Sequence, residues 1–264
     1  MAAAAHQKIP GFGGTAWAGL AFLYAPIVIL IVFSFNSSKL ITVWEGFSAG
    51  WYRVALDNDD LKRACINSLV VGFGAMFFST LIALPTALAM HSRRKKFRGQ
   101  QLTHNLIMLP LLIPEVVIAI ASLSFFTAIG LSLDIGNILI AHIVFCIPFA
   151  YSPLHARLET IPPSLFEAAA DLYAGPWQTF RHVTAPLLMP GIFSGAMLAF
   201  ITSLDDFIIT EMVAPPGAMT LPVYIYSMVR RGITPEINAI SAILLALSMT
   251  LVLSSYLINQ KKPS

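Results

Sequence analysis

The stretch that decides the fold is "PPSLFEAAADLYAGPWQTFRHVTAPLLMP", residues 162–190. It lies between two long apolar runs and is itself neither long enough nor apolar enough to cross a membrane. Ser164 followed by Glu167 fits the S-x-x-E capping box, which predicts that a helix begins here. Gly175 and Pro176 predict its end, because glycine readily adopts the left-handed conformation after a helix and proline cannot continue one. The stretch therefore predicts a short capped helix that connects two spans.

The composition of the whole chain is that of a membrane protein. Of its 264 residues, 57% are hydrophobic and only 11% are charged, whereas a soluble domain carries about 25% charged residues. The chain is therefore predicted to be an all-α, polytopic membrane protein. Six apolar stretches are long enough to cross about 30 Å of hydrocarbon as helices. They are residues 15–35, 66–90, 102–129, 136–156, 186–210 and 238–258.

The distribution of Lys and Arg predicts the orientation of these spans. Five of the sixteen basic residues lie in 91–101, and the basic run 93–98 is typical of a short cytoplasmic loop rather than of a nucleic-acid patch. Placing this loop, both termini and the loop around the 162–190 stretch, with Arg157 and Arg181, on one side puts ten of the sixteen basic residues there. We therefore expect a cytoplasmic N-terminal segment, a transmembrane domain with short cytoplasmic helices, and a cytoplasmic tail. Their predicted bounds are 1–14, 15–258 with helices at 164–184, and 259–264.

The chain shows no signature of a self-contained enzyme. It has two cysteines, Cys65 and Cys146, which make neither a disulfide framework nor a metal site. Its six histidines show no ligand spacing, and nucleophile-elbow and phosphate-loop patterns are absent. A membrane enzyme with a metal or nucleophile cluster is therefore disfavoured, and no metal or cofactor is expected in this chain.

The residues of the predicted short helix divide between two faces. Helical spacing places its apolar side chains in one stripe and its two acids, one turn apart, on another face. Such a helix resembles a knob that projects into the cytoplasm; a helix lying on lipid headgroups is the alternative, weakened by the acidic face because the cytoplasmic leaflet is itself negative. The expected contact residues are Ser164, Leu165, Phe166, Glu167, Ala168, Ala169, Asp171, Tyr173 and Gly175.

The segment "EAAADLYAGPWQTFRHVTAPLL" resembles the EAA loop of ABC importer permeases, whose pattern is roughly E-A-A, three residues, G, nine residues, I-x-L-P. Glu167, Val183 and Pro186 match this pattern well or conservatively. Tyr173 stands where the family has glycine, with Gly175 two positions later, and Ala185 replaces the family leucine. The resemblance implies the type I ABC importer permease fold and a coupling helix that sits in a groove of an ATPase subunit.

The C-terminal half, "SLDDFIITEMVAPPGAMTLPVYIYSMVRRGITPEINAISAILL", is similar to the second permease subunit of spermidine/putrescine importers. This resemblance implies an inner-membrane permease that forms the path for a polyamine. It also implies a second homologous permease, two ATPase subunits that bind ATP and Mg²⁺, and a periplasmic binding protein as partners, besides membrane lipid. Ferric iron, thiamine or an opine are alternative substrates in related importers.

Acidic residues within the spans are candidates for the substrate path, because a charged side chain at the bilayer centre costs about 2.5–3.5 kcal/mol on insertion scales. Glu115 follows Pro114 at an expected break of span three, and Asp205 and Asp206 lie near the outer end of span five. Carboxylates there would compensate the lost hydration of ammonium groups. The alternative is structural, with Asp205 or Asp206 capping a helix end or pairing with an arginine. Glu211 is a weaker candidate of the same kind.

A self-sufficient secondary transporter is the rival class. It predicts internal inverted repeats, and the six spans contain no convincing pair.

Overall fold

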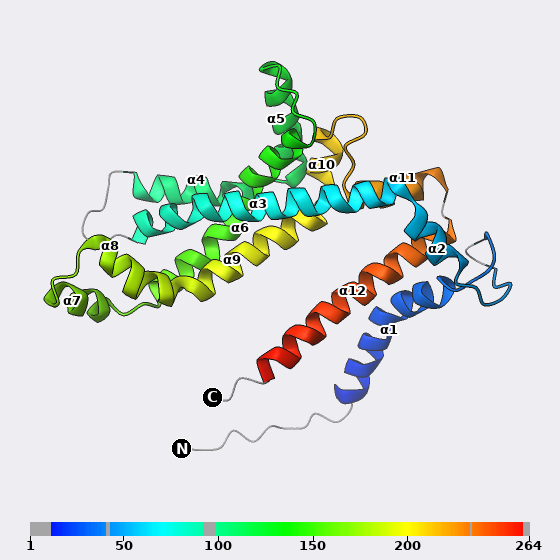
Figure 1. The fold of residues 1–264 in the computed structure, drawn as a ribbon, viewed down its shortest axis with the longest axis horizontal. Coiled ribbons are helices and arrows are strands. Elements are labelled where there is room, and N and C mark those ends of the chain that lie inside the picture. The colour runs from blue at the N-terminus through cyan, green and yellow to red at the C-terminus, as the bar shows by residue number, and fades with distance from the viewer. Residues whose placement is uncertain (1–11, 41–42, 92–98, 233, 261–264) are drawn as a thin grey trace. The chain divides into compact units, whose positions relative to one another are not determined.

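The computed structural model describes residues 12–40, 43–91, 99–232 and 234–260, which form α-helices, one π-helix and no strand beyond an isolated bridge between Asn36 and Phe47. The basic residues of 93–98, Lys8 and the two tail lysines lie outside the described residues. The described chain divides into two compact units, residues 1–59 with 225–264 and residues 60–224. Figure 1 shows the course of the helices.

The helices of the first unit are α1 (Phe12–Phe33), α2 (Gly50–Asp57) and α12 (Pro235–Gln260). Those of the second begin with α3 (Asp59–His91), α4 (Gln100–Leu112), α5 (Glu115–Ala128) and α6 (Ile135–Glu159). The chain continues with α7 (Pro163–Asp171), α8 (Pro176–Thr179), the π-helix η1 (Phe180–Thr184), α9 (Ala185–Asp205) and α10 (Ile208–Val213). Helix α11 (Leu221–Arg231) begins in the second unit and ends in the first.

Four helical segments in the described residues are long and apolar enough to span a membrane: 14–33, 59–91, 135–159 and 176–205. The pair α4 and α5 passes the same test as one broken span, and α12 covers the sixth predicted span. The architecture is thus all-α and consistent with six spans. Helix α1 is apolar on every side and none of its spanning window is buried within the chain, as expected where lipid is the solvent.

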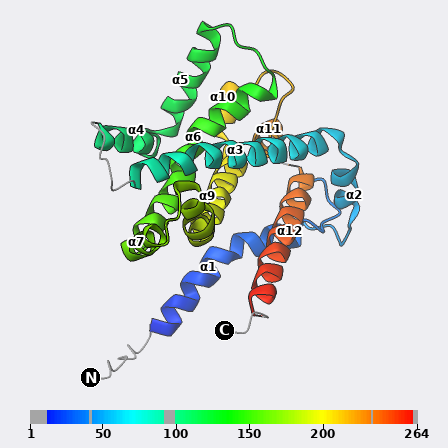
Figure 2. The same cartoon turned by 60° about the vertical axis from the view of Figure 1, so that its left-hand side comes forward.

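The core of the second unit lies between α6 and α9, which run side by side (Figures 1 and 2). Tyr151 and Leu188 are fully buried in it. The backbones approach closely because α9 presents glycine at the contact. A Cβ added to Gly195 would clash with the carbonyl oxygen of Ala150, and one added to Gly191 would come within 2.7 Å of the Arg157 side chain. Small residues are a common solution for helix pairs in membranes, where packing rather than hydrophobic burial drives association.

The third predicted span is bent rather than straight. Helices α4 and α5 meet at an angle of 105° across Ile113 and Pro114. Proline disfavours the helical conformation in the residue before it, and Ile113 is indeed extended, with φ −87° and ψ 135°. In Figures 1 and 2, α5 turns away from the direction of α4. The break predicted at Pro114 therefore leaves the N-terminus of α5, with Glu115, inside the second unit.

The first unit is held together by polar side chains at the ends of its helices. The Asn58 amide, next to α2, donates a hydrogen bond to Glu236 in the first turn of α12 at 2.8 Å. Buried Asn36 organises the loop after α1, because its amide donates to the Val43 carbonyl and its oxygen accepts from the N–H of Glu45.

Candidate functional site: the coupling segment and the buried polar junction

The short helix between the fourth and fifth spans begins one residue earlier than predicted. Pro162 is the N-cap and Pro163 the first residue of α7, with no side-chain cap hydrogen bond. The capping box predicted for Ser164 and Glu167 is therefore wrong, and both side chains are exposed. Proline at the first helical position is preset for the helix and lacks the N–H that a cap would satisfy. Pro163 thus starts the helix before Ser164 can cap it.

The end of α7 is a Schellman motif centred on Tyr173. The N–H of Ala174 donates to the carbonyl of Ala169 at 3.0 Å, and the N–H of Tyr173 to that of Ala170 at 2.9 Å. Tyr173 has φ +57°, whereas Gly175 has φ −67°. The prediction that Gly175 supplies the left-handed residue is therefore wrong. Tyr173 occupies that conformation at a cost of roughly 1–2 kcal/mol.

The predicted apolar stripe of α7 is divided between the protein interior and its surface. Ala169 is buried and Phe166 packs partly against the core. The remaining three side chains are exposed, Leu165 at 39%, Leu172 at 81% and Tyr173 at 96%. The face with exposed Ala168 and the two acids Glu167 and Asp171 is also open to the outside. We call residues 163–175 the coupling segment.

The coupling segment leads directly into the fifth span. The N–H of Gly175 donates to the Gln178 side chain at 2.9 Å at the start of α8. From there α8, η1 and α9 form one helical span of 30 residues. The end of the region predicted as cytoplasmic helices, 164–184, thus continues without a break into this span through the π-helical turn. The helix that follows the coupling segment therefore continues to the close contact between α9 and α6.

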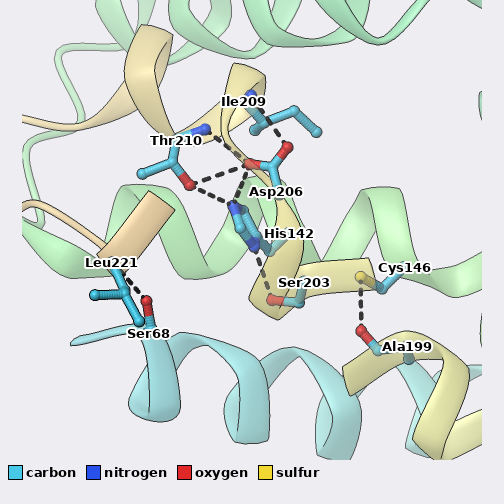
Figure 3. A network of polar contacts seen from close by, with 9 residues as sticks. All are labelled: Ser68, His142, Cys146, Ala199, Ser203, Asp206, Ile209, Thr210 and Leu221. Carbon is cyan, nitrogen blue, oxygen red and sulfur yellow. Dashed lines mark hydrogen bonds and ion pairs between the residues drawn. The ribbon is translucent and has the colours of Figure 1, made fainter. Parts of the chain in front are cut away.

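At the other end of α9 lies a cluster of buried polar groups, which we call the buried polar junction: His142, Ser203, Asp206 and Thr210 (Figure 3). Asp206 follows the last residue of α9 and accepts hydrogen bonds from the N–H groups of Ile209 and Thr210, so it caps α10. The chain needs this cap because the helical course breaks at Asp206 and Phe207. The span predicted to reach residue 210 therefore ends at 205.

Buried His142, on α6, joins three helices in this junction. Its Nδ1 lies 2.8 Å from the Ser203 hydroxyl on α9, and its Nε2 lies 3.0 Å from both Asp206 and the Thr210 hydroxyl. The Thr210 hydroxyl itself donates to Asp206. Because Nε2 faces two oxygens that are both acceptors toward it, this nitrogen carries a proton and donates. His142 thereby compensates the buried carboxylate of Asp206.

The three acidic residues predicted for the substrate path lie together. The carboxyl group of Glu115, at the start of α5, lies close enough to those of Asp206 and Asp205 to interact with them electrostatically. Asp206 is buried and its oxygens are engaged by the protein, which favours the structural alternative for this residue. Asp205 is exposed and Glu115 is half-exposed, so the side chains of these two residues are accessible from outside the chain. Glu211 is exposed on α10.

Sequence reasoning missed His142. The available signal was the cost of an ionisable group within a span, which requires a partner nearby. Ser203, Asp206 and Thr210 recur at spacings of three and four, a polar line that indicates such a partner on another helix.

Apolar helices with a broken span beside an acidic cluster, and an exposed short helix between the fourth and fifth spans, fit a membrane permease. The sequence of residues 75–261 matches the family "Binding-protein-dependent transport system inner membrane component". The chain belongs to this family.

Its curated relatives include polyamine transport proteins. The chain is 39% identical to the spermidine/putrescine transport system permease protein PotC of Escherichia coli K12, over 95% of this chain and 94% of PotC. It is 40% identical to the putrescine transport system permease protein PotI of the same strain, over 86% of this chain and 83% of PotI. The putative 2-aminoethylphosphonate transport system permease protein PhnV of Salmonella typhimurium is 30% identical over 89% of this chain.

Solved structures share the fold. A bacterial ABC transporter that imports alginate matches over the full length of both chains, with a TM-score of 0.71 and 16% identity. The MetNI methionine ABC transporter in an inward-facing conformation matches 74% of this chain and 92% of its own, with a TM-score of 0.63 and 21% identity. The fold is therefore that of ABC importer membrane subunits.

Proposed function

We propose that the chain is the permease subunit of an ATP-driven importer of putrescine or spermidine in the bacterial inner membrane. The observation that carries the substrate is its 39% identity to PotC over nearly the whole of both chains. The acidic residues at the breaks of the third and fifth spans support a cationic substrate. The chain itself contributes no ATP site; its partners would be a second permease, two ATPase subunits that bind ATP and Mg²⁺, and a periplasmic binding protein.

The coupling segment, residues 163–175, is the proposed contact with an ATPase subunit on the cytoplasmic side. Its exposed Leu165, Leu172 and Tyr173 offer apolar area, and Glu167 and Asp171 offer negative charge for basic groups of the ATPase. Closure of the ATPases around ATP would move this segment, and α9 would carry the motion to α6. Opening would then be a rigid-body change between two states that the nucleotide favours differently.

Co-purification tests the coupling segment. The complete importer is purified from membranes through a tag on this chain. Glu167→Arg with Asp171→Arg is expected to reduce the retained ATPase about tenfold or more, because the charge of the contact is reversed. Asp57→Arg with Asp60→Arg is the matched control, since both acids are exposed on the proposed outer side. Ala169 is unsuitable for this test because it is buried. An equal loss of retained ATPase in both double variants would contradict the assignment of the coupling segment as the ATPase contact.

Glu115 and Asp205 are the proposed carboxylates of the substrate path. Each retains exposed surface and can accept hydrogen bonds from an ammonium group, which are worth about 1.5–3 kcal/mol when charge-assisted. Glu115→Gln and Asp205→Asn should each lower putrescine uptake by about tenfold or more, while Glu211→Gln, an exposed acid on nearby α10, should leave uptake within about twofold. Unchanged uptake in both path variants would remove these residues from the path.

The substrate class is tested by competition in cells that carry the whole system. Uptake of labelled putrescine should fall with added spermidine and should be lost when the gene for this chain is deleted. The relative PhnV makes 2-aminoethylphosphonate the second candidate. This compound carries a negative phosphonate, which the acidic cluster would repel. Inhibition of putrescine uptake by 2-aminoethylphosphonate, but not by spermidine, would favour the second candidate.

The proposed topology places residues 1–14 and 259–264 in the cytoplasm, with the transmembrane domain at 15–258 and its cytoplasmic helices at 164–184. In a Cys65→Ser background, a cysteine introduced at Ser264 should therefore react with an impermeant maleimide only after the cells are opened. Labelling of intact cells would show that the orientation is the opposite of the one proposed.

A further inference from the structure

Tyr173 combines two properties that are unfavourable within the chain alone. Its backbone is left-handed, with φ +57°, a conformation in which the Cβ of a tyrosine is strained and glycine is not. Its side chain is 96% exposed, so no packing inside the chain offsets the strain. A strained residue without internal compensation indicates a functional position.

The turn that carries Tyr173 is rigid. Two backbone hydrogen bonds, from the N–H groups of Tyr173 and Ala174 back to α7, hold it closed. Beside Tyr173, Leu172 is 81% exposed. A preorganised apolar tip loses little conformational entropy when it binds, which favours its use as a contact. Tyrosine suits such a contact because it has a large apolar ring and a hydroxyl group that can remain at the rim.

The residues next to exposed Leu172 and Tyr173 favour a protein rather than lipid as the binding partner. Glu167 and Asp171 are exposed one turn apart on the helix that ends at Tyr173. The cytoplasmic leaflet carries negative charge, so two carboxylates next to the tip oppose its insertion among headgroups. A protein surface with basic side chains around an apolar pocket complements both features.

We propose that Tyr173 is the anchor by which this permease recognises its ATPase, with the ring inserted into an apolar pocket of that subunit and basic residues of the ATPase facing Glu167 and Asp171. The inference rests on the proposed function, which makes the ATPase the occupant of this surface. It goes beyond that function because it assigns the recognition to a residue that stands where the family pattern has glycine.

Replacing Tyr173 by glycine distinguishes an anchor from a purely structural residue. The anchor predicts a higher Kd for the ATPase, whereas a residue that does not bind predicts an unchanged or lower Kd. The importer's membrane subunits are held in nanodiscs, and the Kd of the purified ATPase is measured by interferometry for wild type and three variants. Tyr173→Gly removes both the ring and the strain. Tyr173→Ala removes the ring but keeps a Cβ in the left-handed region, which controls for the flexibility of glycine. Tyr173→Phe keeps the ring.

If Tyr173 is the anchor, Tyr173→Gly and Tyr173→Ala should each raise the Kd of the ATPase about tenfold or more. Tyr173→Phe should change this Kd by less than about threefold. The thermal midpoint of Tyr173→Gly should be unchanged or higher, because its backbone is relaxed. An unchanged or lower Kd for Tyr173→Gly overturns the inference, and this is also the result expected if the ring contacts lipid. Failure of the wild-type subunits to bind the ATPase at all would instead overturn the proposed function.

Discussion

The buried polar junction and the coupling segment lie at opposite ends of α9 and differ in how their side chains are satisfied. At the junction, polar groups that would be costly in a membrane are paired with one another inside the chain, as His142 is with Asp206. In the coupling segment, the apolar side chains of Leu172 and Tyr173 are exposed on the surface of the chain. The first region is complete by itself, whereas the second needs a partner. Stability should therefore depend on the junction, and assembly on the coupling segment.

His142→Ala should produce the largest loss of stability. It leaves the carboxylate of Asp206 buried without its partner, which costs about 3–5 kcal/mol when one half of a buried pair is removed. The free energy of unfolding in mixed micelles is the measurement. His155→Ala is the control on the same helix, because His155 is only half-buried and its partner Glu159, at 3.7 Å, is largely exposed. That variant should lose about 1 kcal/mol or less, and equal losses would contradict the role of the junction.

Gly195→Ala tests the helix that connects the two regions. The added methyl group would meet the backbone carbonyl of Ala150 on α6, so the helices must separate at a cost of about 1–3 kcal/mol. Gly19→Ala is the matched control within another helix, α1, where an added Cβ meets nothing within 4 Å. It should be neutral or slightly stabilising. Destabilisation by the control alone would show that the α6–α9 contact does not limit stability.

Asp206→Asn and Asp205→Asn separate the two neighbouring acids by unfolding free energy. Asparagine at 206 keeps an acceptor for the N–H of Thr210 but loses the charge-assisted bonds to His142, a change of about 1–2 kcal/mol. Because Asp205 is exposed, Asp205→Asn should lower the free energy of unfolding by less than about 0.5 kcal/mol. If Asp205→Asn is the more destabilising change, the division into a structural and an accessible acid is wrong.

Ser164→Ala should have the smallest effect. A serine that caps a helix contributes about 1 kcal/mol, but Ser164 lies inside α7 and makes no cap hydrogen bond. We expect less than about 0.5 kcal/mol in hydrogen-exchange protection of the amides of α7. A loss near 1 kcal/mol would restore the capping box that the sequence predicts.

Much of this arrangement was predictable from hydrophobic pattern and proline. The apolar runs located the long helices, Pro114 located the break before Glu115, and the "EAA" stretch located the short helix. These features are local, because they depend on residues within a few positions of one another.

Features that depend on competing or distant partners were not predictable. Pro163 displaced Ser164 as the start of α7, since two valid start signals competed at adjacent positions. Tyr173 rather than Gly175 became left-handed, because the turn required that conformation two residues earlier than glycine occurs. His142 and Asp206 are 64 positions apart, from their numbers in the sequence, so only the packing of α6 against α9 and α10 reveals the pair.

The central claim is that the coupling segment contacts an ATPase subunit, and site-specific photo-crosslinking tests it most directly. A benzophenone amino acid replaces exposed Leu172 in the coupling segment, or exposed Trp44 in the loop after α1 as control, in membranes that carry the assembled importer. We predict a crosslink to the ATPase from position 172 and none from position 44. No ATPase adduct from position 172, with the importer intact and active in uptake, would contradict the account.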